Sequence, residues 1–127
     1  MNEVVLDASA LLAYIQDEPG SDVVAEAVAG ATISAVNLSE VIARLLYNMS
    51  MDEVKQIITR LDLEIIPFDM EQAFQAAELR PPTRHLGLSL GDRACLQLAR
   101  TLGKTVLTAD RAWFQLTHLQ AEVKVIR

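Results

Sequence analysis

Cysteine and histidine are scarce in this sequence, which contains one Cys and two His among 127 residues. The single thiol, Cys95, cannot form a disulfide within the chain, and these counts disfavour a zinc centre. Basic residues are also in the minority, since 11 Lys and Arg accompany 17 Asp and Glu for a net charge of −6. This balance disfavours nonspecific coating of DNA or of an anionic membrane, because such binding depends on neutralising phosphates.

Long apolar runs, linkers and repeats are missing as well. The longest stretch without a charged residue, 27–39, is too short and too polar for the ~20-residue span of a membrane helix. Glu3 stands where a signal peptide would carry positive charge, and Asp7 interrupts any apolar segment there. We therefore expect a single cytoplasmic domain over residues 1–127, with no membrane partner.

Apolar side chains make up 51% of the chain, enough for a hydrophobic core. Runs of strand length alternate with stretches of helical period, which predicts an α/β fold with a mainly parallel sheet. We expect strands at 4–6, 31–34, 63–67, 104–108 and 122–126. We expect helices at 8–16, 21–29, 37–49, 50–61, 69–79, 89–102 and 111–116, with a proline-containing loop over 80–88.

Several of these helices carry recognisable end signals. Asn37 with Glu40 three residues later resembles a capping box, so we expect the helix to begin at Asn37. The other expected caps are Ser21, Ser50 or Asp52, Asp69 and Ser89 at helix starts, and Gly103 at a helix end.

Two of the predicted strands end in aspartate, at Asp7 and Asp110. The functional crevice of an open parallel sheet lies at the carboxyl ends of its strands. An aspartate after a strand is commonly only a turn former or a helix cap. Two of them at the same edge favour a site.

Two further acids stand in the first turns of predicted helices. Asp92 lies on the flank of the apolar arc of the 89–102 helix, where it fits a site residue and a capping-box partner of Ser89 equally well. Glu40 lies on the polar face of its helix, and in isolation it is typical of a solvated first-turn glutamate.

Taken together, these four acids indicate a metal site. Helices that follow strand ends place their first turns over one sheet edge, so Asp7, Glu40, Asp92 and Asp110 can converge. Clustered carboxylates raise one another's pKa values, and a hard divalent cation such as Mg²⁺ or Mn²⁺ removes that cost. Such a site can activate water for attack on a phosphodiester, although spacing alone does not prove it.

Four stretches along the chain share the order and spacing of a known family: VLDASALLA (5–13), SAVNLSEV (34–41), LSLGDRACL (88–96) and VLTADRAW (106–113). Together they resemble the PIN-domain family, and within it the VapC-type toxins of toxin–antitoxin pairs. The resemblance covers the whole chain. It implies a three-layer α/β/α sandwich with a mainly parallel central sheet.

The resemblance also implies roles for single residues. Asp7 and Asp92 would be the main Mg²⁺ ligands, and Asp110 would contribute directly or through water. Glu40 would help to hold a metal-bound water or a second ion. Two small hydroxyl residues would orient the carboxylates, and these are Ser9 and Thr108.

The implied activity is that of a Mg²⁺-dependent endoribonuclease toxin, with Mn²⁺ as a plausible substitute. A metal-activated water would attack phosphorus and leave 5′-phosphate and 3′-hydroxyl ends. The implied partners are an RNA substrate (tRNA or rRNA), a cognate antitoxin and a second copy in a homodimer. DNA would be bound only through the antitoxin.

Other residues leave alternatives open. A group of basic side chains either guides RNA phosphates or forms solvated loop charge, and its members are Arg80, Arg84, His85, Arg93 and Arg111. Apolar side chains within 45–51 fit a dimer surface or the monomer core equally well. Cys95 is expected in the core rather than as a nucleophile, and Trp113 and Phe114 as anchors of the 111–116 helix.

Three other functions compete with the toxin. One is a housekeeping PIN-type RNA-processing nuclease. The second is a Mg²⁺-binding, receiver-like signalling domain without nuclease activity, which would need paired acids where Asp7 is followed by Ala8. The third is a metal-free RNA-binding or scaffolding domain, which four acids at one site disfavour.

Overall fold

A five-stranded parallel sheet lies at the centre of the molecule. The computed structural model describes residues 3–113 and 121–127. The strand order is β3-β2-β1-β4-β5, and every paired strand is parallel to its neighbour. The strands are β1 (Val4–Leu6), β2 (Thr32–Ser34), β3 (Glu64–Ile66), β4 (Thr105–Thr108) and β5 (Val123–Val125). The first strand is therefore central, and its carboxyl end is flanked by those of β2 and β4.

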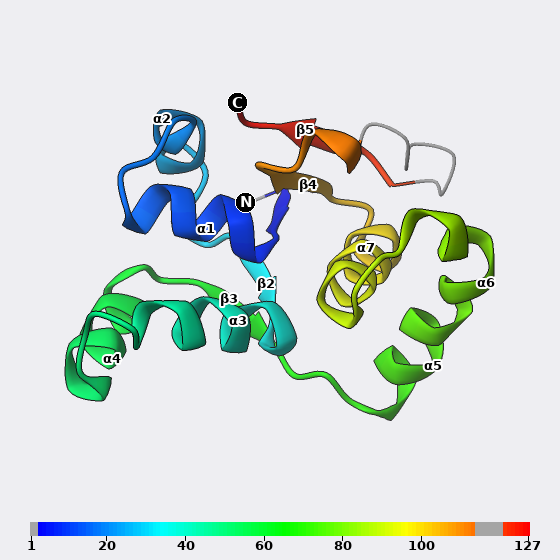
Figure 1. The fold of residues 1–127 in the computed structure, drawn as a ribbon, viewed down its shortest axis with the longest axis horizontal. Coiled ribbons are helices and arrows are strands. Elements are labelled where there is room, and N and C mark those ends of the chain that lie inside the picture. The colour runs from blue at the N-terminus through cyan, green and yellow to red at the C-terminus, as the bar shows by residue number, and fades with distance from the viewer. Residues whose placement is uncertain (1–2, 114–120) are drawn as a thin grey trace.

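Helices cover both faces of this sheet (Figure 1). One group consists of α1 (Ala8–Ile15), α2 (Ser21–Ala25), α3 (Ala35–Leu45) and α4 (Met51–Arg60). The other consists of α5 (Met70–Glu78), α6 (Arg80–Thr83), the 3₁₀ helix η1 (Arg84–Leu86) and α7 (Leu90–Leu102). Successive residues of β1 point to opposite faces, so Leu6 packs in the core beneath α1 and Val5 packs in the core beneath α7. The expected three-layer α/β/α sandwich is confirmed.

Most of the expected helix ends are confirmed. Ser50 and Ser89 both form capping boxes, with Glu53 and Asp92 respectively, and Asp69 caps α5. Gly103 ends α7 in the left-handed conformation, at φ 65°.

Two expected helix starts were wrong. The third helix begins at Ala35 rather than Asn37, because the Ser34 hydroxyl accepts a hydrogen bond from the Val36 amide at 3.2 Å and caps it at once. The second helix is capped by Gly20 rather than Ser21, with Gly20 at φ 96°.

Other expected segments also differ in extent, and the third helix ends at Leu45 rather than Met49. The second helix ends at Ala25 rather than near residue 29. The expected loop over 80–88 contains α6 and η1, because prolines are tolerated in the first turn of a helix. Of the expected 111–116 helix, a single 3₁₀ turn at 111–113 is seen, and the rest, with Phe114, lies outside the described residues. No helix in 3–113 or 121–127 combines the length and apolar character needed to cross a bilayer.

Candidate active site

The central acid of the site, Asp7, follows β1 directly and is 6% exposed. Its Oδ1 accepts hydrogen bonds from the Ser9 hydroxyl at 2.7 Å and from the Ala10 amide at 2.8 Å. Its Oδ2 accepts one from the Thr108 hydroxyl at 2.5 Å. Both oxygens are therefore held by fixed donors, and the carboxylate has one orientation.

Thr108 connects this acid to the next one. It ends β4, which pairs with β1, and its Oγ1 accepts a hydrogen bond from the Asp110 amide at 3.0 Å. Ser9 closes the network, since its Oγ accepts one from the Ala109 amide at 2.9 Å. The two hydroxyl residues thus contact Asp7 and fix the turn that carries Asp110, as their predicted orienting role requires.

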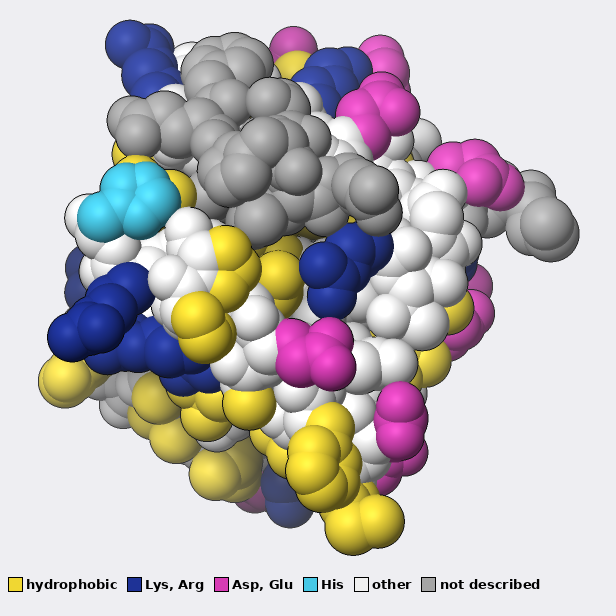
Figure 2. Space-filling model, turned by 90° about the vertical axis from the view of Figure 1, so that its right-hand side faces the viewer, with side chains coloured by type: hydrophobic (Ala, Val, Ile, Leu, Met, Phe, Trp, Pro, Cys, Tyr) yellow, Lys and Arg dark blue, Asp and Glu magenta, His cyan; other side chains and the backbone are white. Residues whose placement is uncertain are grey.

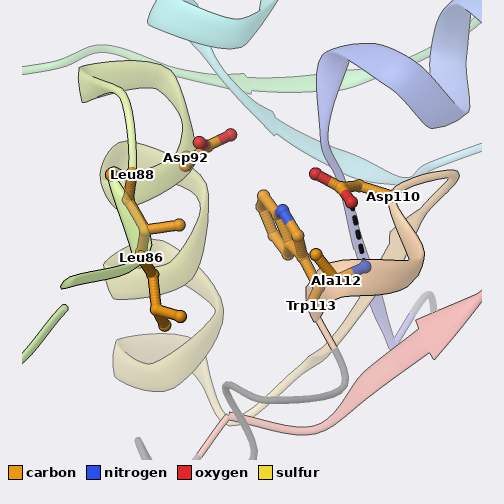
Figure 3. A pocket seen from close by; sticks show the side chains of 7 residues that line it. Leu86, Leu88, Asp92, Asp110, Ala112 and Trp113 are labelled. Atoms are coloured by element: carbon orange, nitrogen blue, oxygen red, sulfur yellow. Dashed lines mark hydrogen bonds between the residues drawn. The ribbon is translucent and has the colours of Figure 1, made fainter.

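Asp110 and Asp92 face each other across a small cavity (Figure 3). Asp110 is exposed, and its Oδ1 accepts a hydrogen bond from the Ala112 amide at 3.0 Å. Asp92 is half-buried and forms the capping box, in which its Oδ2 accepts from the Ser89 amide at 3.0 Å. Asp92 therefore forms the predicted capping box and also lines the cavity.

The cavity has a volume of about 170 Å³, and it is lined by these two carboxylates together with apolar side chains. Trp113, which is 2% exposed, lies between them with its indole edge toward the acids (Figure 3). Trp113 therefore belongs to the core, as expected. At roughly 30 Å³ for each water, the cavity has room for about five water molecules.

Glu40 approaches the same region from α3. Its Oε1 accepts a hydrogen bond at 3.0 Å from the side chain of Asn37, which also donates to the Gly91 carbonyl at 3.0 Å. The sequence misidentified Asn37 as a helix cap, since an Asn three residues before a Glu fits both arrangements. The glycine directly before Asp92 was the available sign that another helix packs closely at this point.

Three of the acids affect the ionisation of neighbouring groups. Burial raises the pKa of Asp7 to about 6, against its three hydrogen bonds, and the Asp92 carboxylate adds to the rise. Partial desolvation raises the pKa of Glu40, with a further contribution from Asp92. Burial, with the charges of these three acids, raises the pKa of the Cys95 thiol well above its ordinary value. Cys95 is fully buried beneath the acids, so the expectation of a core cysteine is confirmed.

The acidic group fits a hard divalent cation held mainly by water. Within the described residues, no three His, Cys, Asp or Glu side chains are grouped closely enough to hold an ion. Magnesium usually keeps several waters and takes one or two carboxylates. Asp92 and Asp110 line a cavity large enough for water, and Asp7 lies near enough for the Asp92 charge to raise its pKa. Burial, with a smaller contribution from the Asp92 charge, raises the pKa of Asp7, and a cation beside the carboxylate would offset that cost.

The basic residues have differing surroundings. Arg93 donates to the Ala76 carbonyl at 3.2 Å, and Arg111 donates to the Arg127 carbonyl at 2.9 Å. Both arginines therefore bind backbone carbonyl oxygens, and these contacts do not by themselves favour a role in binding phosphate. Arg84 and His85 are exposed. Figure 2 shows Lys and Arg side chains, in dark blue, gathered on one part of the face that it draws. The phosphate-guiding hypothesis is therefore best represented by Arg84.

Comparison with known proteins places this geometry in a family. The PIN domain model matches residues 4–119. No match is found among curated protein sequences.

The fold is shared with chains from solved toxin–antitoxin complexes. One is a toxin–antitoxin complex from Klebsiella pneumoniae, with a TM-score of 0.77, 16% identity and 98% of each chain covered. Another is DNA-bound VapBC from Salmonella typhimurium, with a TM-score of 0.75, 15% identity and 100% of each chain covered. A third is VapBC-5 from Mycobacterium tuberculosis, with a TM-score of 0.61, 25% identity and 98% of each chain covered. With its sheet order, its acidic edge and the family match over most of its length, the chain belongs to the PIN domain family.

Proposed function

We propose that this protein is a VapC-type toxin, a Mg²⁺-dependent endoribonuclease that cleaves RNA phosphodiesters. The observation that carries the proposal is the Asp7 carboxylate, buried at the end of the central strand, held through both oxygens and close to Asp92. Membership of the PIN domain family supports a nuclease. The toxin–antitoxin origin of the structural neighbours supports the toxin class.

In this proposal Asp7 and Asp92 hold the metal ion, and Asp110 contributes directly or through water. Bound Mg²⁺ would supply a water nucleophile and neutralise charge on the phosphate, and Mn²⁺ offers the same chemistry. Glu40 orients a water molecule from the α3 side. Ser9 and Thr108 keep the Asp7 carboxylate fixed, so that no reorientation is needed when the substrate arrives.

The proposed partners follow from the same comparison. An antitoxin is the proposed regulator, and DNA binding is assigned to it because this chain is acidic overall, with a net charge of −6. The substrate class is RNA, either tRNA or rRNA. We also propose a cytoplasmic homodimer, for which Leu46, Tyr47 and Met51 are exposed apolar side chains.

The alternatives have less support. A receiver-like phosphoacceptor needs an accessible aspartate, whereas Asp7 is buried with both oxygens engaged. A housekeeping RNA-processing nuclease would use the same chemistry. A growth assay distinguishes it from a toxin. We expect expression of a toxin to arrest cell growth, and expression of the Asp7→Ala variant to leave growth unaffected.

The direct test uses purified, antitoxin-free protein with end-labelled tRNA and rRNA in Mg²⁺, Mn²⁺ or EDTA. We expect discrete cuts that depend on the metal and disappear in Asp7→Ala and Asp92→Ala. Glu53→Ala is the matched control, because Glu53 occupies the same capping-box position in α4 as Asp92 does in α7. Absence of cleavage by folded, metal-supplied protein would overturn the proposal.

A further inference from the structure

The amide of Asn37 joins two helices at the edge of the acidic site. Asn37 is 1% exposed in α3, and its Nδ2 donates to Glu40 Oε1 in the same helix and to the Gly91 carbonyl of α7, each at 3.0 Å. Both neighbours are acceptors, so only the nitrogen of the amide can face them. The orientation of the Asn37 side chain is thereby fixed.

Gly91 provides the space that this arrangement needs. A Cβ built on Gly91 would overlap Glu40 Oε1 and would lie 2.6 Å from Oε2. Real Cβ atoms do not approach oxygen so closely, so a side chain at this position would displace the Glu40 carboxylate. The same residue therefore accepts the Asn37 hydrogen bond, makes room for Glu40 and directly precedes Asp92.

The other half of the amide shows that stability alone does not explain the residue. Asn37 Oδ1 is buried and has no hydrogen-bond partner among the described residues. A buried acceptor without a partner is unfavourable, and an apolar residue would avoid it. The two donated hydrogen bonds are the feature that only an amide of this length supplies here.

We propose that Asn37 is a positioning residue that holds the Glu40 carboxylate against the Gly91 backbone and so sets its separation from Asp92. The proposal rests on the proposed function, because it assigns Asn37 a role in the metal-dependent reaction. Asn37 acts through Glu40 and does not itself contact RNA or metal.

The test combines Asn37→Ala, Glu40→Ala and the double variant. Loss of a partner of a metal-site carboxylate typically reduces metal affinity or activity by about 10- to 100-fold. We expect Asn37→Ala to weaken Mn²⁺ binding, measured calorimetrically without RNA, and to lower the cleavage rate within that range, with little change in KM for RNA. In the Glu40→Ala background the same change should lower the rate by about twofold or less, the scatter of independent sites.

Gln97→Ala is the matched control. Gln97 is a fully buried amide in α7, the helix that contains Gly91, and it donates to Gln72 of α5 at 2.9 Å. Like Asn37, it has a side-chain oxygen without a partner among the described residues. It should lower thermal stability as Asn37→Ala does and leave Mn²⁺ affinity unchanged. If Asn37→Ala does not fold, Gly91→Ala displaces the Glu40 carboxylate from the other helix and should give the same metal defect.

The outcomes separate the two proposals. Wild-type Mn²⁺ affinity and cleavage in Asn37→Ala, or effects of Asn37→Ala that add fully to those of Glu40→Ala, would overturn the positioning role and leave the nuclease intact. A wild-type protein that neither binds Mn²⁺ nor cuts RNA would overturn both.

Discussion

The acidic site has a strand side, which consists of Asp7 and Asp110 after β1 and β4, and a helix side, which consists of Glu40 in α3 and Asp92 in α7. The carboxylates of the two sides are held by different means. On the strand side, Asp7 is buried and accepts hydrogen bonds from Ser9, Ala10 and Thr108. On the helix side, Glu40 is exposed and Asp92 half-buried, and each is held by a side chain or amide of its own helix. The strand-side carboxylate is therefore held through both oxygens in a buried position, whereas each helix-side carboxylate is held through one oxygen, among the described residues, in a more accessible position.

The largest expected effect comes from removing the charge of the fixed carboxylate. Asp7→Asn keeps the shape of the side chain and removes a proposed metal ligand, so cleavage should fall by more than the roughly 100-fold typical of losing a ligand's partner. Single-turnover cleavage of end-labelled RNA measures it. Glu40→Gln on the helix side should cost less, because Glu40 is exposed. Equal losses in the two variants would contradict the division into two sides.

The next effect concerns the stability of metal-free protein. The pKa of Asp7 is about 6 in the folded state against an ordinary value of 3.8, so between these pH values the folded state retains a proton that the unfolded chain releases. The free energy of unfolding should therefore fall as pH rises from about 4 to 6, by on the order of 3 kcal/mol.

Denaturation in EDTA across this pH range measures the effect. Asp7→Asn should remove most of the slope and be the more stable protein above pH 6. Saturating Mg²⁺ should offset the loss in wild-type protein, since a cation favours the ionised carboxylate. A slope that persists in Asp7→Asn would show that another group carries the proton.

Removing a hydroxyl from the strand side should have an intermediate effect. Thr108→Val preserves the side-chain shape but removes the donor to Asp7 and the acceptor for the Asp110 amide. We expect Mn²⁺ affinity or cleavage to fall by about 10- to 100-fold. Thr105→Val at the other end of β4 is the control and should leave metal binding unchanged.

A smaller effect is expected from the helix side. Ser89→Ala removes the capping hydroxyl that accepts from the Asp92 amide at 3.1 Å, and should lower stability by about 1 kcal/mol. Ser50→Ala removes the equivalent capping hydroxyl of α4 and should have a similar cost. Only Ser89→Ala should also weaken Mn²⁺ binding, because only its partner is a proposed ligand. If the two variants bind Mn²⁺ with the same affinity, Ser89 acts only as a helix cap.

The smallest effect concerns RNA phosphates. Arg84→Ala should leave the metal affinity unchanged and weaken RNA binding slightly. For one lost phosphate contact on single-stranded RNA, the slope of log affinity against log salt should decrease by about 0.7. An unchanged slope would remove Arg84 from the substrate path.

The strand side could be predicted from the sequence because the signals for it are local. Short apolar runs ending in Asp7 and Asp110 place both acids at the carboxyl edge of a parallel sheet, whichever strands are neighbours. The Ser89–Asp92 capping box could also be predicted from the sequence, since its residues lie three apart on one helix.

The helix side was less accessible because it depends on packing between distant segments. The contact of Asn37 with Gly91 crosses from α3 to α7, and the local pattern N-x-x-E favoured a cap instead. The buried pair of Gln72 and Gln97 joins α5 to α7 and has no local signature.

The position of Cys95 allows the opening of the acidic site to be followed by thiol labelling. The only thiol of the chain lies in α7 and is fully buried. Its pKa is raised by burial and, to a smaller extent, by the charges of Asp7, Asp92 and Glu40. A thiol reagent can reach it only when α7 separates from the sheet, so the labelling rate counts openings of the acidic site itself. A cation that ties Asp7 to Asp92 would close that route, and the slowing of labelling would give its occupancy without any RNA present.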